Sequence, residues 1–277
     1  MTVVYLSPHL DDAVLSCGGA IRGLVAQGEP VQVITLITED IAPGGALSPF
    51  AQKLHLDWGN HPRPFSLRRT EDLAALAMLG AQALHLDYLD AIYRTGADGA
   101  WMYTDGGLLF GQVRADDPLA CDGGKQLASA LADLLAPAFL LGEVKRVCAP
   151  LAVGCHVDHQ IVHAAAWTLL GWGYPVAFYE DYPYAARPGA TDLALEAAGA
   201  TGWRMKIQPL GAGDLEAKVA ALGYYRSQLP ILFGGSEAMI GQVWAFASTR
   251  AQEVGLAERI WWPPETGARA GSGVRGD

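Results

Sequence analysis

Residues 1–19 read Met-Thr-Val-Val-Tyr-Leu-Ser-Pro-His-Leu-Asp-Asp-Ala-Val-Leu-Ser-Cys-Gly-Gly. Residues 3–6 are apolar and rich in β-branched side chains, which predicts a short buried strand, and residues 13–25 predict a helix. A second β-branched run, residues 31–37, follows at the spacing of a β-α-β unit. We therefore expect an α/β fold with a parallel sheet.

The remaining pattern extends this prediction along the chain. Ser66 and Asp214 are expected to cap helices, and Pro137 is expected to end one. Strands are predicted over residues 83–88, 146–152, 175–180 and 204–209, the last at a sheet edge or in a hairpin, and helices over residues 66–79, 125–135, 158–170, 214–227 and 235–247.

Metal-competent side chains follow the first predicted strand at once. His9, Asp11 and Asp12 lie within four residues at its carboxyl end, where open α/β sheets place their sites. A buried surplus of carboxylate is costly unless it is neutralised, and a metal ion is the simplest neutralising group. Capping of the following helix is the alternative explanation. It accounts for one aspartate but for neither the histidine nor the pair.

A second cluster follows the strand predicted over residues 146–152. Residues 154–163 read Gly-Cys-His-Val-Asp-His-Gln-Ile-Val-His and contain three of the seven histidines. A parallel sheet would place this strand end on the same edge as the first. Histidine and aspartate from one loop and histidine from another form a common zinc set with an open fourth position. His159 and His163, four apart on a helix, are an alternative ligand pair, and Cys155 is a further candidate ligand.

These two motifs together resemble the LmbE / PIG-L family of zinc-dependent N-deacetylases, which act on N-acetylglucosamine-type sugars. The matching residues are Pro8-His9-Leu10-Asp11-Asp12 with Gly18-Gly19, and His156-Val157-Asp158-His159. The usual first motif is Ala-His-Pro-Asp-Asp-Glu, so Pro8 and Ala13 depart from it. The resemblance extends to about Gln228 and implies a Rossmann-like three-layer fold with a mostly parallel central sheet.

The resemblance also implies a catalytic arrangement. It places a Zn²⁺ ion, or another divalent metal such as Fe²⁺, on His9, Asp12 and His159. Asp11 would then be free to act as general base toward a water molecule. His156 would stabilise the oxyanion or act as the acid, and Asp158 would orient a histidine.

The expected reaction is hydrolysis of the N-acetyl amide of an N-acetylglucosamine-type conjugate, a small-molecule N-acyl amino sugar. Arg68 and Asp90 match sugar-contacting positions of the family. An amidohydrolase acting on a non-sugar amide and a non-catalytic sugar-binding relative are the alternatives. A nucleotide-binding loop at Gly18-Gly19 is disfavoured because Gly-x-Gly-x-x-Gly spacing is absent.

Composition limits the remaining classes. The chain has 277 residues, 51% of them hydrophobic, and a net charge of −10 with no basic run, which argues against a nucleic-acid partner. We expect a single domain over residues 1–262 and a disordered tail over residues 263–277. No signal peptide or membrane-spanning run is seen, so a cytoplasmic protein is expected. The oligomeric state is left open.

Residues 94–124 are rich in glycine and aspartate and are long for a loop in a compact domain. They are expected to form a functional lid or insertion. Trp101, Tyr103 and Phe110 within it are candidates either for stacking on a sugar or for attaching the loop to the body of the protein.

Overall fold

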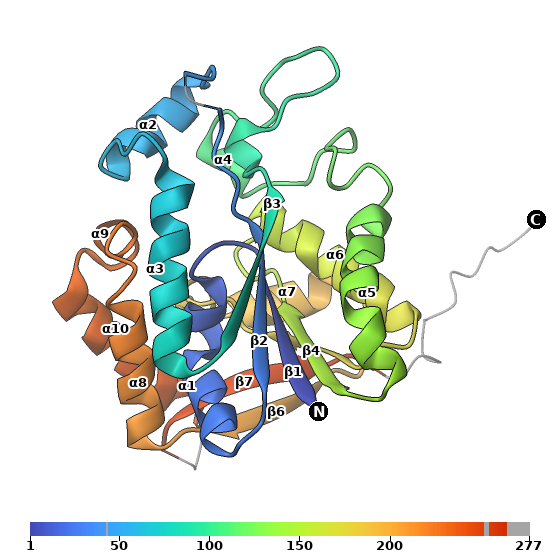
Figure 1. The fold of residues 1–277 in the computed structure, drawn as a ribbon, viewed down its shortest axis with the longest axis vertical. Coiled ribbons are helices and arrows are strands. Elements are labelled where there is room, and N and C mark those ends of the chain that lie inside the picture. Colours follow the sequence, from blue (N-terminus) through green and yellow to red (C-terminus); the bar gives the residue numbers. More distant parts are fainter. Residues whose placement is uncertain (43, 252–254, 265–277) are drawn as a thin grey trace, which may run out of the picture.

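The structure is a computed structural model that describes residues 1–42, 44–251 and 255–264. In this part of the chain a seven-stranded sheet has the order β3-β2-β1-β4-β5-β7-β6 (Figure 1). Its strands are β1 (Thr2–Ser7), β2 (Val31–Ile37), β3 (Gln82–Tyr88), β4 (Val144–Pro150), β5 (Val176–Tyr179), β6 (Arg204–Pro209) and β7 (Ala257–Trp262). The first five strands are parallel, and β7 is antiparallel to both β5 and β6. The predicted α/β fold with a mostly parallel central sheet is confirmed.

Helices cover both faces of this sheet. The longer ones are α1 (Asp12–Ala26), α3 (Pro64–Leu79), α5 (Lys125–Leu140), α6 (Val157–Gly171), α8 (Ala212–Leu222) and α10 (Ser236–Arg250). The shorter ones are α2 (Pro49–Asp57), α4 (Gly106–Leu109), α7 (Ala190–Ala197) and α9 (Leu229–Phe233), with 3₁₀ turns η1 (Ala91–Tyr93) and η2 (Tyr184–Ala186). Helices α1, α3 and α8 lie on one side of the strands, and α5 and α6 lie on the other (Figure 1). This is the predicted three-layer arrangement.

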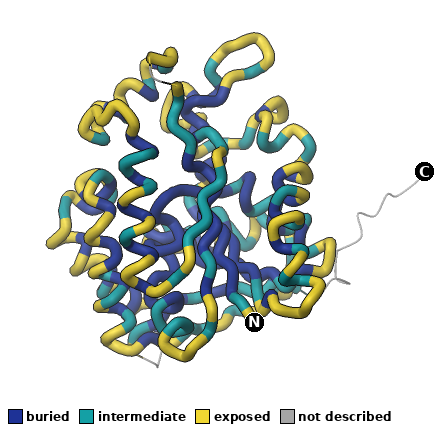
Figure 2. The backbone as a smooth tube through the Cα atoms, in the orientation of Figure 1, coloured by how far each residue is buried: buried dark blue, intermediate teal, exposed yellow. Residues whose placement is uncertain are grey.

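The core lies where the parallel strands are covered on both faces. Figure 2 shows the central strands as a buried band inside the helices. Tyr5, Leu6, Val147 and Phe178 are fully buried there. Burying Leu6, Val147 or Phe178 contributes about 1.5–3 kcal/mol relative to leaving it exposed, which explains why the central parts of these strands are apolar.

Gly18 and Gly19 lie inside α1 and not in a phosphate-binding loop. A Cβ at Gly18 would lie 2.9 Å from Cγ of Lys218, and one at Gly19 would lie 2.7 Å from Cδ1 of Leu210. The two glycines therefore allow α8 and its preceding loop to approach α1 closely.

Several predicted helix boundaries are wrong, and for α3 the reason is a residue distant in the sequence. Helix α3 begins at Pro64, and Ser66 is not its N-cap, because the carboxylate of Asp40 accepts hydrogen bonds from the backbone N–H groups of Phe65 and Ser66. Helix α5 continues through Pro137 to Leu140. Helix α8 begins at Ala212, with Asp214 in its first turn and not at the cap.

Strand β7 was not predicted. It lies between β5 and β6, so β6 occupies the edge position that the sequence predicts. Residues 265–277 of the predicted tail lie outside the described residues. No helix in the described ranges is both long enough and apolar enough to cross a membrane.

A candidate metal-dependent active site

Two loops at the carboxyl ends of adjacent strands bring the predicted metal ligands together. His9 and Asp12 follow β1, and His159 lies in the first turn of α6, after β4. Nδ1 of His9 is 3.1 Å from Oδ2 of Asp12, and Nε2 of His159 is 3.2 Å from the same oxygen. All three side chains are buried. Both predicted histidine ligands therefore contact the predicted aspartate ligand.

Each of these histidines is held by a second carboxylate. Nε2 of His9 lies 3.1 Å from Oδ2 of Asp158, and Nδ1 of His159 lies 2.7 Å from Oδ1 of Asp181. A neutral imidazole that donates one N–H keeps a lone pair on its other nitrogen. When a metal ion replaces the proton on the nitrogen that faces Asp12, the second carboxylates would leave Nδ1 of His9 and Nε2 of His159 as electron donors, which is the usual support for metal-binding histidines.

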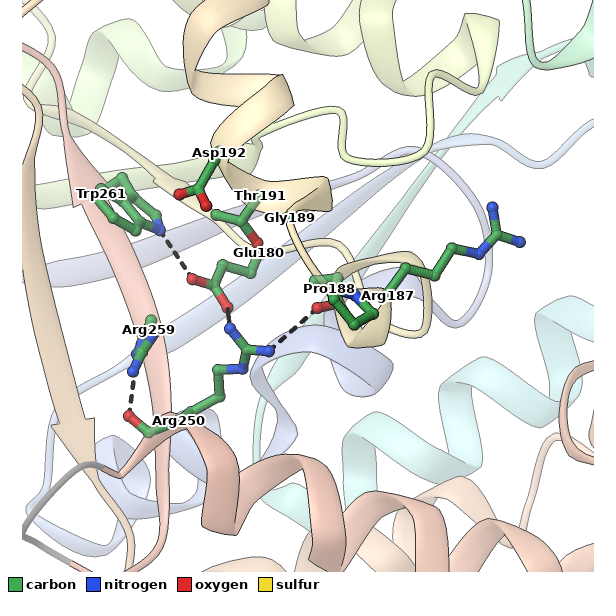
Figure 3. A pocket seen from close by; sticks show the side chains of 10 residues that line it. Glu180, Arg187, Pro188, Gly189, Thr191, Asp192, Arg250, Arg259 and Trp261 are labelled. Carbon is green, nitrogen blue, oxygen red and sulfur yellow. Dashed lines mark hydrogen bonds and ion pairs between the residues drawn. The ribbon is translucent and has the colours of Figure 1, made fainter.

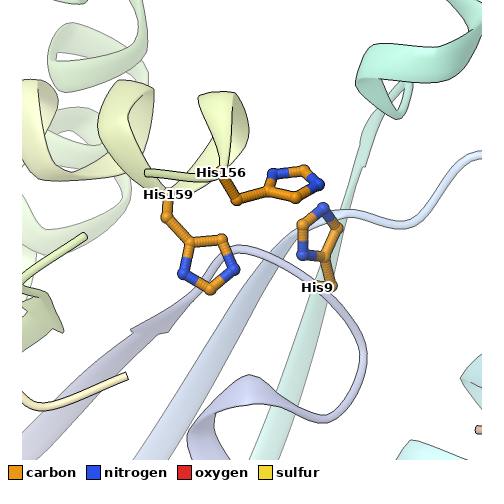
Figure 4. A group of neighbouring side chains, drawn as sticks. All are labelled: His9, His156 and His159. Atoms are coloured by element: carbon orange, nitrogen blue, oxygen red, sulfur yellow. The ribbon is translucent and has the colours of Figure 1, made fainter. Parts of the chain in front are cut away.

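His156 completes a group of three histidines. One ring nitrogen from each of His9, His156 and His159 lies within 4.8 Å of the others, and Figure 4 shows the three rings gathered around one space. Nδ1 of His156, however, accepts a hydrogen bond from the backbone N–H of Asp158. Its proton must then reside on Nε2, which makes this ring a hydrogen-bond donor and not an electron-pair donor to a metal.

The electrostatics agree with this assignment. Burial, together with the neighbouring His9, lowers the pKa of His156 well below its usual value, so that ring is neutral. Burial alone would also lower the pKa of His9, but its hydrogen bonds with Asp12 and Asp158 raise it to about 9. The pKa of His159 is raised for the same reason by Asp12 and Asp181, against the effect of burial. The cluster therefore favours added positive charge.

The number of buried charged groups also indicates that the cluster favours added positive charge. The buried cluster and its immediate neighbours contain five aspartates and two arginines, namely Asp11, Asp12, Asp90, Asp158, Asp181, Arg68 and Arg94. Unneutralised buried carboxylates are strongly unfavourable. Two imidazole nitrogens and a carboxylate oxygen are a donor set that zinc and iron both accept. The residues present therefore fit a divalent metal ion.

Asp11 lies beside this set. Burial raises the pKa of its carboxyl to about 7, and nearby Arg68 opposes the rise. Nη2 of Arg68 is 3.5 Å from Oδ2 of Asp11. The guanidinium also lies over the rings of Trp58 and Phe65, at 5.7 and 5.3 Å from their centroids. Arg68 is thus fixed in the site and does not form a surface ion pair.

Both carboxylate oxygens of Asp90 already have neighbours within the protein. Asp90 is the N-cap of η1, and its Oδ1 accepts a hydrogen bond from the backbone N–H of Ile92. Its Oδ2 lies 3.7 Å from Nε2 of His9. Contact with substrate at this position stays a prediction.

Two supporting residues are missing from the sequence-based set. Asp181 follows β5, and its contact with His159 was not predicted from the sequence. Arg94 binds Oδ1 of Asp158 at 2.6 Å and Oδ2 of Asp117 at 3.1 Å. No local pattern marks Arg94, because its partners lie at distant positions in the chain.

Residues 94–124 are attached to the site at several points. The side-chain amide of Gln160 in α6 donates a hydrogen bond to the carbonyl oxygen of Gly111. The Phe110 ring is 41% exposed, and its centroid lies 5.1 Å from that of His156 and 5.8 Å from that of Tyr184. Tyr103, in contrast, is buried and donates to Asp117. Of the candidate aromatic residues, Phe110 is the one at the histidine cluster.

The alternative ligands lie elsewhere. Nδ1 of His163 lies 2.9 Å from the carbonyl oxygen of Pro150, and its Nε2 accepts from Nε1 of Trp167. Both nitrogens are used, so His163 has no free lone pair. Cys155 is exposed and belongs to neither of the metal-competent groups found among the described residues.

Fold and site together define an α/β protein with a histidine–aspartate cluster at the carboxyl edge of a parallel sheet. The chain belongs to the PIG-L family, because the family model described as GlcNAc-PI de-N-acetylase matches residues 4–170.

Two relatives are similar along nearly the whole chain. The 2'-N-acetylparomamine deacetylase of Streptomyces fradiae is 29% identical over 284 residues, covering 95% of this chain and 90% of that protein. The enzyme of the same name from Niallia circulans is 27% identical, with 96% and 92% covered. Among solved structures, the zinc-inhibited form of teicoplanin deacetylase Orf2 matches with a TM-score of 0.77 and 29% identity, covering 96% of this chain and 100% of that chain.

Proposed function

We propose that this protein is a metal-dependent N-deacetylase. It hydrolyses the N-acetyl amide of an N-acetylglucosamine-type sugar conjugate to a free amine and acetate. The observation that carries the proposal is the convergence of His9, Asp12 and His159, each histidine oriented by a second carboxylate, with Asp11 beside them. The relatives named above are deacetylases, which are hydrolases of amide C–N bonds.

His9 through Nδ1, Asp12 through its carboxylate and His159 through Nε2 would hold the metal. When bound, a divalent metal supplies Lewis acidity that lowers the pKa of water toward ~7 and polarises an amide carbonyl. Zinc is the first candidate. Fe²⁺ or another divalent ion is a second, since the donor set accepts it and since one relative was solved in a form named as zinc-inhibited.

Asp11 is the proposed general base. A carboxylate whose pKa is about 7 can take a proton from water near neutral pH and return it to the leaving amine. The positive charge of Arg68 limits how far burial raises that pKa, and its ion pair holds the carboxylate in place. Arg68 and Asp90 are also the proposed contacts for the sugar.

His156 is the proposed oxyanion donor. Because its Nδ1 accepts the backbone N–H of Asp158, its Nε2–H is fixed as a donor without any change of protonation. A preorganised neutral donor of this kind stabilises charge that develops on the carbonyl oxygen. Protonating the ring would break the hydrogen bond at Nδ1, so this role fits better than that of acid. Asp158 serves by orienting His9.

A substrate panel tests the proposal. Release of primary amine is measured with N-acetylparomamine, simple N-acetylglucosamine conjugates, teicoplanin and a non-sugar N-acetyl amide such as an N-acetyl amino acid. The proposal expects turnover of at least one sugar substrate and its loss in Asp11→Asn. Turnover of the non-sugar amide alone would move the assignment to a different amidohydrolase, and binding without turnover would indicate a non-catalytic relative.

A further inference from the structure

A polar cavity is lined in part by the segment of residues 180–187. It has a volume of about 170 Å³, enough for a small polar ligand. Figure 3 shows its side chains around Glu180 and Arg250. It is lined by Glu180, Ala185, Arg187, Pro188, Gly189, Thr191, Asp192, Arg250, Arg259 and Trp261.

Three buried polar atoms in this lining lack a hydrogen-bond partner within the described part of the chain. They are the hydroxyl of Thr191, which is 8% exposed, Nε of Arg250, and Oε2 of Glu180, which only forms an ion pair with Arg250. Buried polar groups are nearly always paired, and each one left unpaired costs about 1–3 kcal/mol. The Thr191 hydroxyl and Nε of Arg250, which no ion pair compensates, therefore indicate a ligand.

The amino terminus of α7 adds further donors. Its N-cap is Gly189, with a φ of 76° and no side chain to accept a hydrogen bond from the first turn. Thr191 and Asp192 lie in that turn, and both line the cavity. Uncapped N–H groups at a helix start favour a negatively charged partner.

The acidic residue at the centre of the cavity is already neutralised. Oε1 of Glu180 accepts a hydrogen bond from Nε1 of Trp261 at 3.0 Å, and its Oε2 lies 3.4 Å from Nη1 of Arg250. Arg259 is held against Arg250, because its Nε donates to the Arg250 carbonyl oxygen. The Arg187 guanidinium extends away from the cavity (Figure 3), and Arg259 balances the charge of Asp192. What remains in excess is hydrogen-bond donors, namely Nε of Arg250 and the N–H groups in the first turn of α7.

We propose that this cavity binds a small oxyanion, a carboxylate or a phosphate group. The oxygens of the anion would accept hydrogen bonds from Nε of Arg250, from the hydroxyl of Thr191 and from backbone N–H groups in the first turn of α7. The segment that supplies Glu180 and Ala185 to the cavity also carries Asp181, whose carboxylate contacts His159. A bound anion would therefore support the segment that positions His159. This proposal does not depend on the proposed reaction.

The test is a binding titration of the metal-loaded protein with inorganic phosphate and with acetate, followed by calorimetry and by the unfolding temperature. Sodium chloride at equal ionic strength controls for screening. We expect saturable binding of at least one oxyanion, weakened about fivefold or more in Thr191→Val and in Arg250→Gln. Arg114→Gln, an exposed arginine paired with Asp116, is the matched control and should bind as the wild type does.

Asp12→Asn separates this cavity from the metal site, since it should lose metal but keep the anion response. Thr191→Val is nearly isosteric, so it decides the matter if Arg250→Gln fails to fold. Preference for acetate would identify the product of the proposed reaction as the source, and preference for phosphate would identify a free metabolite. Equal responses in wild type and Thr191→Val, an equal effect of chloride, or loss of binding only in Asp12→Asn would each overturn the proposal.

Discussion

Asp11 has a carboxylate that is buried, lies next to a metal-ligand candidate and is held by a single arginine. Asp11→Asn keeps the shape but cannot accept a proton. We expect kcat to fall about 10²- to 10⁴-fold, the usual contribution of a general base, while metal content is unchanged. Kinetics and metal analysis of the same sample check this. Asp87→Asn, which removes an exposed partner of Arg69, is the control, and full activity in Asp11→Asn would refute the assignment.

His163 gives a prediction about stability and pH. Burial lowers its pKa to about 4, and a protonated ring could not accept from Trp167. The folded state then binds fewer protons than the unfolded state between pH ~6.5 and ~4, so this residue destabilises the fold as pH falls through that window, by at most ~3 kcal/mol. His163→Gln should flatten the dependence of the unfolding free energy on pH there. Parallel curves for wild type and His163→Gln, with exposed His61→Gln as control, would contradict this.

At the scale of elements, the five parallel strands could be predicted because each contains apolar side chains in a strand pattern, although only β1, β2, β5 and most of β4 are buried and β3 is half-buried. Strand β7 could not, because Glu258 and Arg259 interrupt its apolar pattern. Glu258 is buried only because Lys218 of α8 lies 2.7 Å away and because backbone N–H groups of α1 donate to it. The start of α3 was likewise set by Asp40, which is distant in sequence. Contacts with residues distant in the sequence, and not local propensity, therefore determine strand β7 and the start of α3.

The turn between β4 and α6 depends on Gly154. Its φ is 89°, and a Cβ there would lie 2.5 Å from Cγ of Tyr184. Gly154→Ala should destabilise the protein by ~1–3 kcal/mol and lower kcat, because the displaced ring contacts His159. Gly173→Ala is the matched control, since its φ is 95° but a Cβ there meets no atom within 4 Å. Equal losses of kcat in both variants would show that backbone strain alone is responsible.

The position of Phe110 indicates that the segment of residues 94–124 contacts the substrate. An exposed apolar ring beside His156 is suited to contact the acetyl group or the sugar. Phe110→Ala should raise KM roughly 5- to 10-fold, from ~1 kcal/mol of lost contact, with a smaller effect on kcat. Leu108→Ala, in the same segment and similarly exposed, should leave KM unchanged. An unaltered KM in Phe110→Ala would place the substrate elsewhere.

For the whole molecule, the parallel sheet explains why most of the candidate site was predictable. The motifs at residues 9–12 and 156–159 follow adjacent strands, and their carboxyl ends meet at one edge. Asp181 and Arg94 were missed because they act on those motifs from other loops. Long-range pairing of this kind leaves no periodic signal in the chain.

The cluster also predicts that metal stabilises the fold. A ligand that binds only the folded state contributes about 2.7 kcal/mol at a hundred times its dissociation constant. Removing metal with a chelator should therefore lower the unfolding temperature by several degrees, and zinc should restore it. His159→Ala should show no response to zinc, and an equal response in that variant would place the metal elsewhere.

The most direct test of metal-dependent deacetylation is acetate release from an N-acetylated amino sugar by metal-stripped protein, before and after reloading with zinc or Fe²⁺. We predict almost no release from the stripped protein, recovery with at least one of the two ions, and no recovery in Asp12→Asn. Equal release with and without metal, or full recovery in Asp12→Asn, would contradict the account.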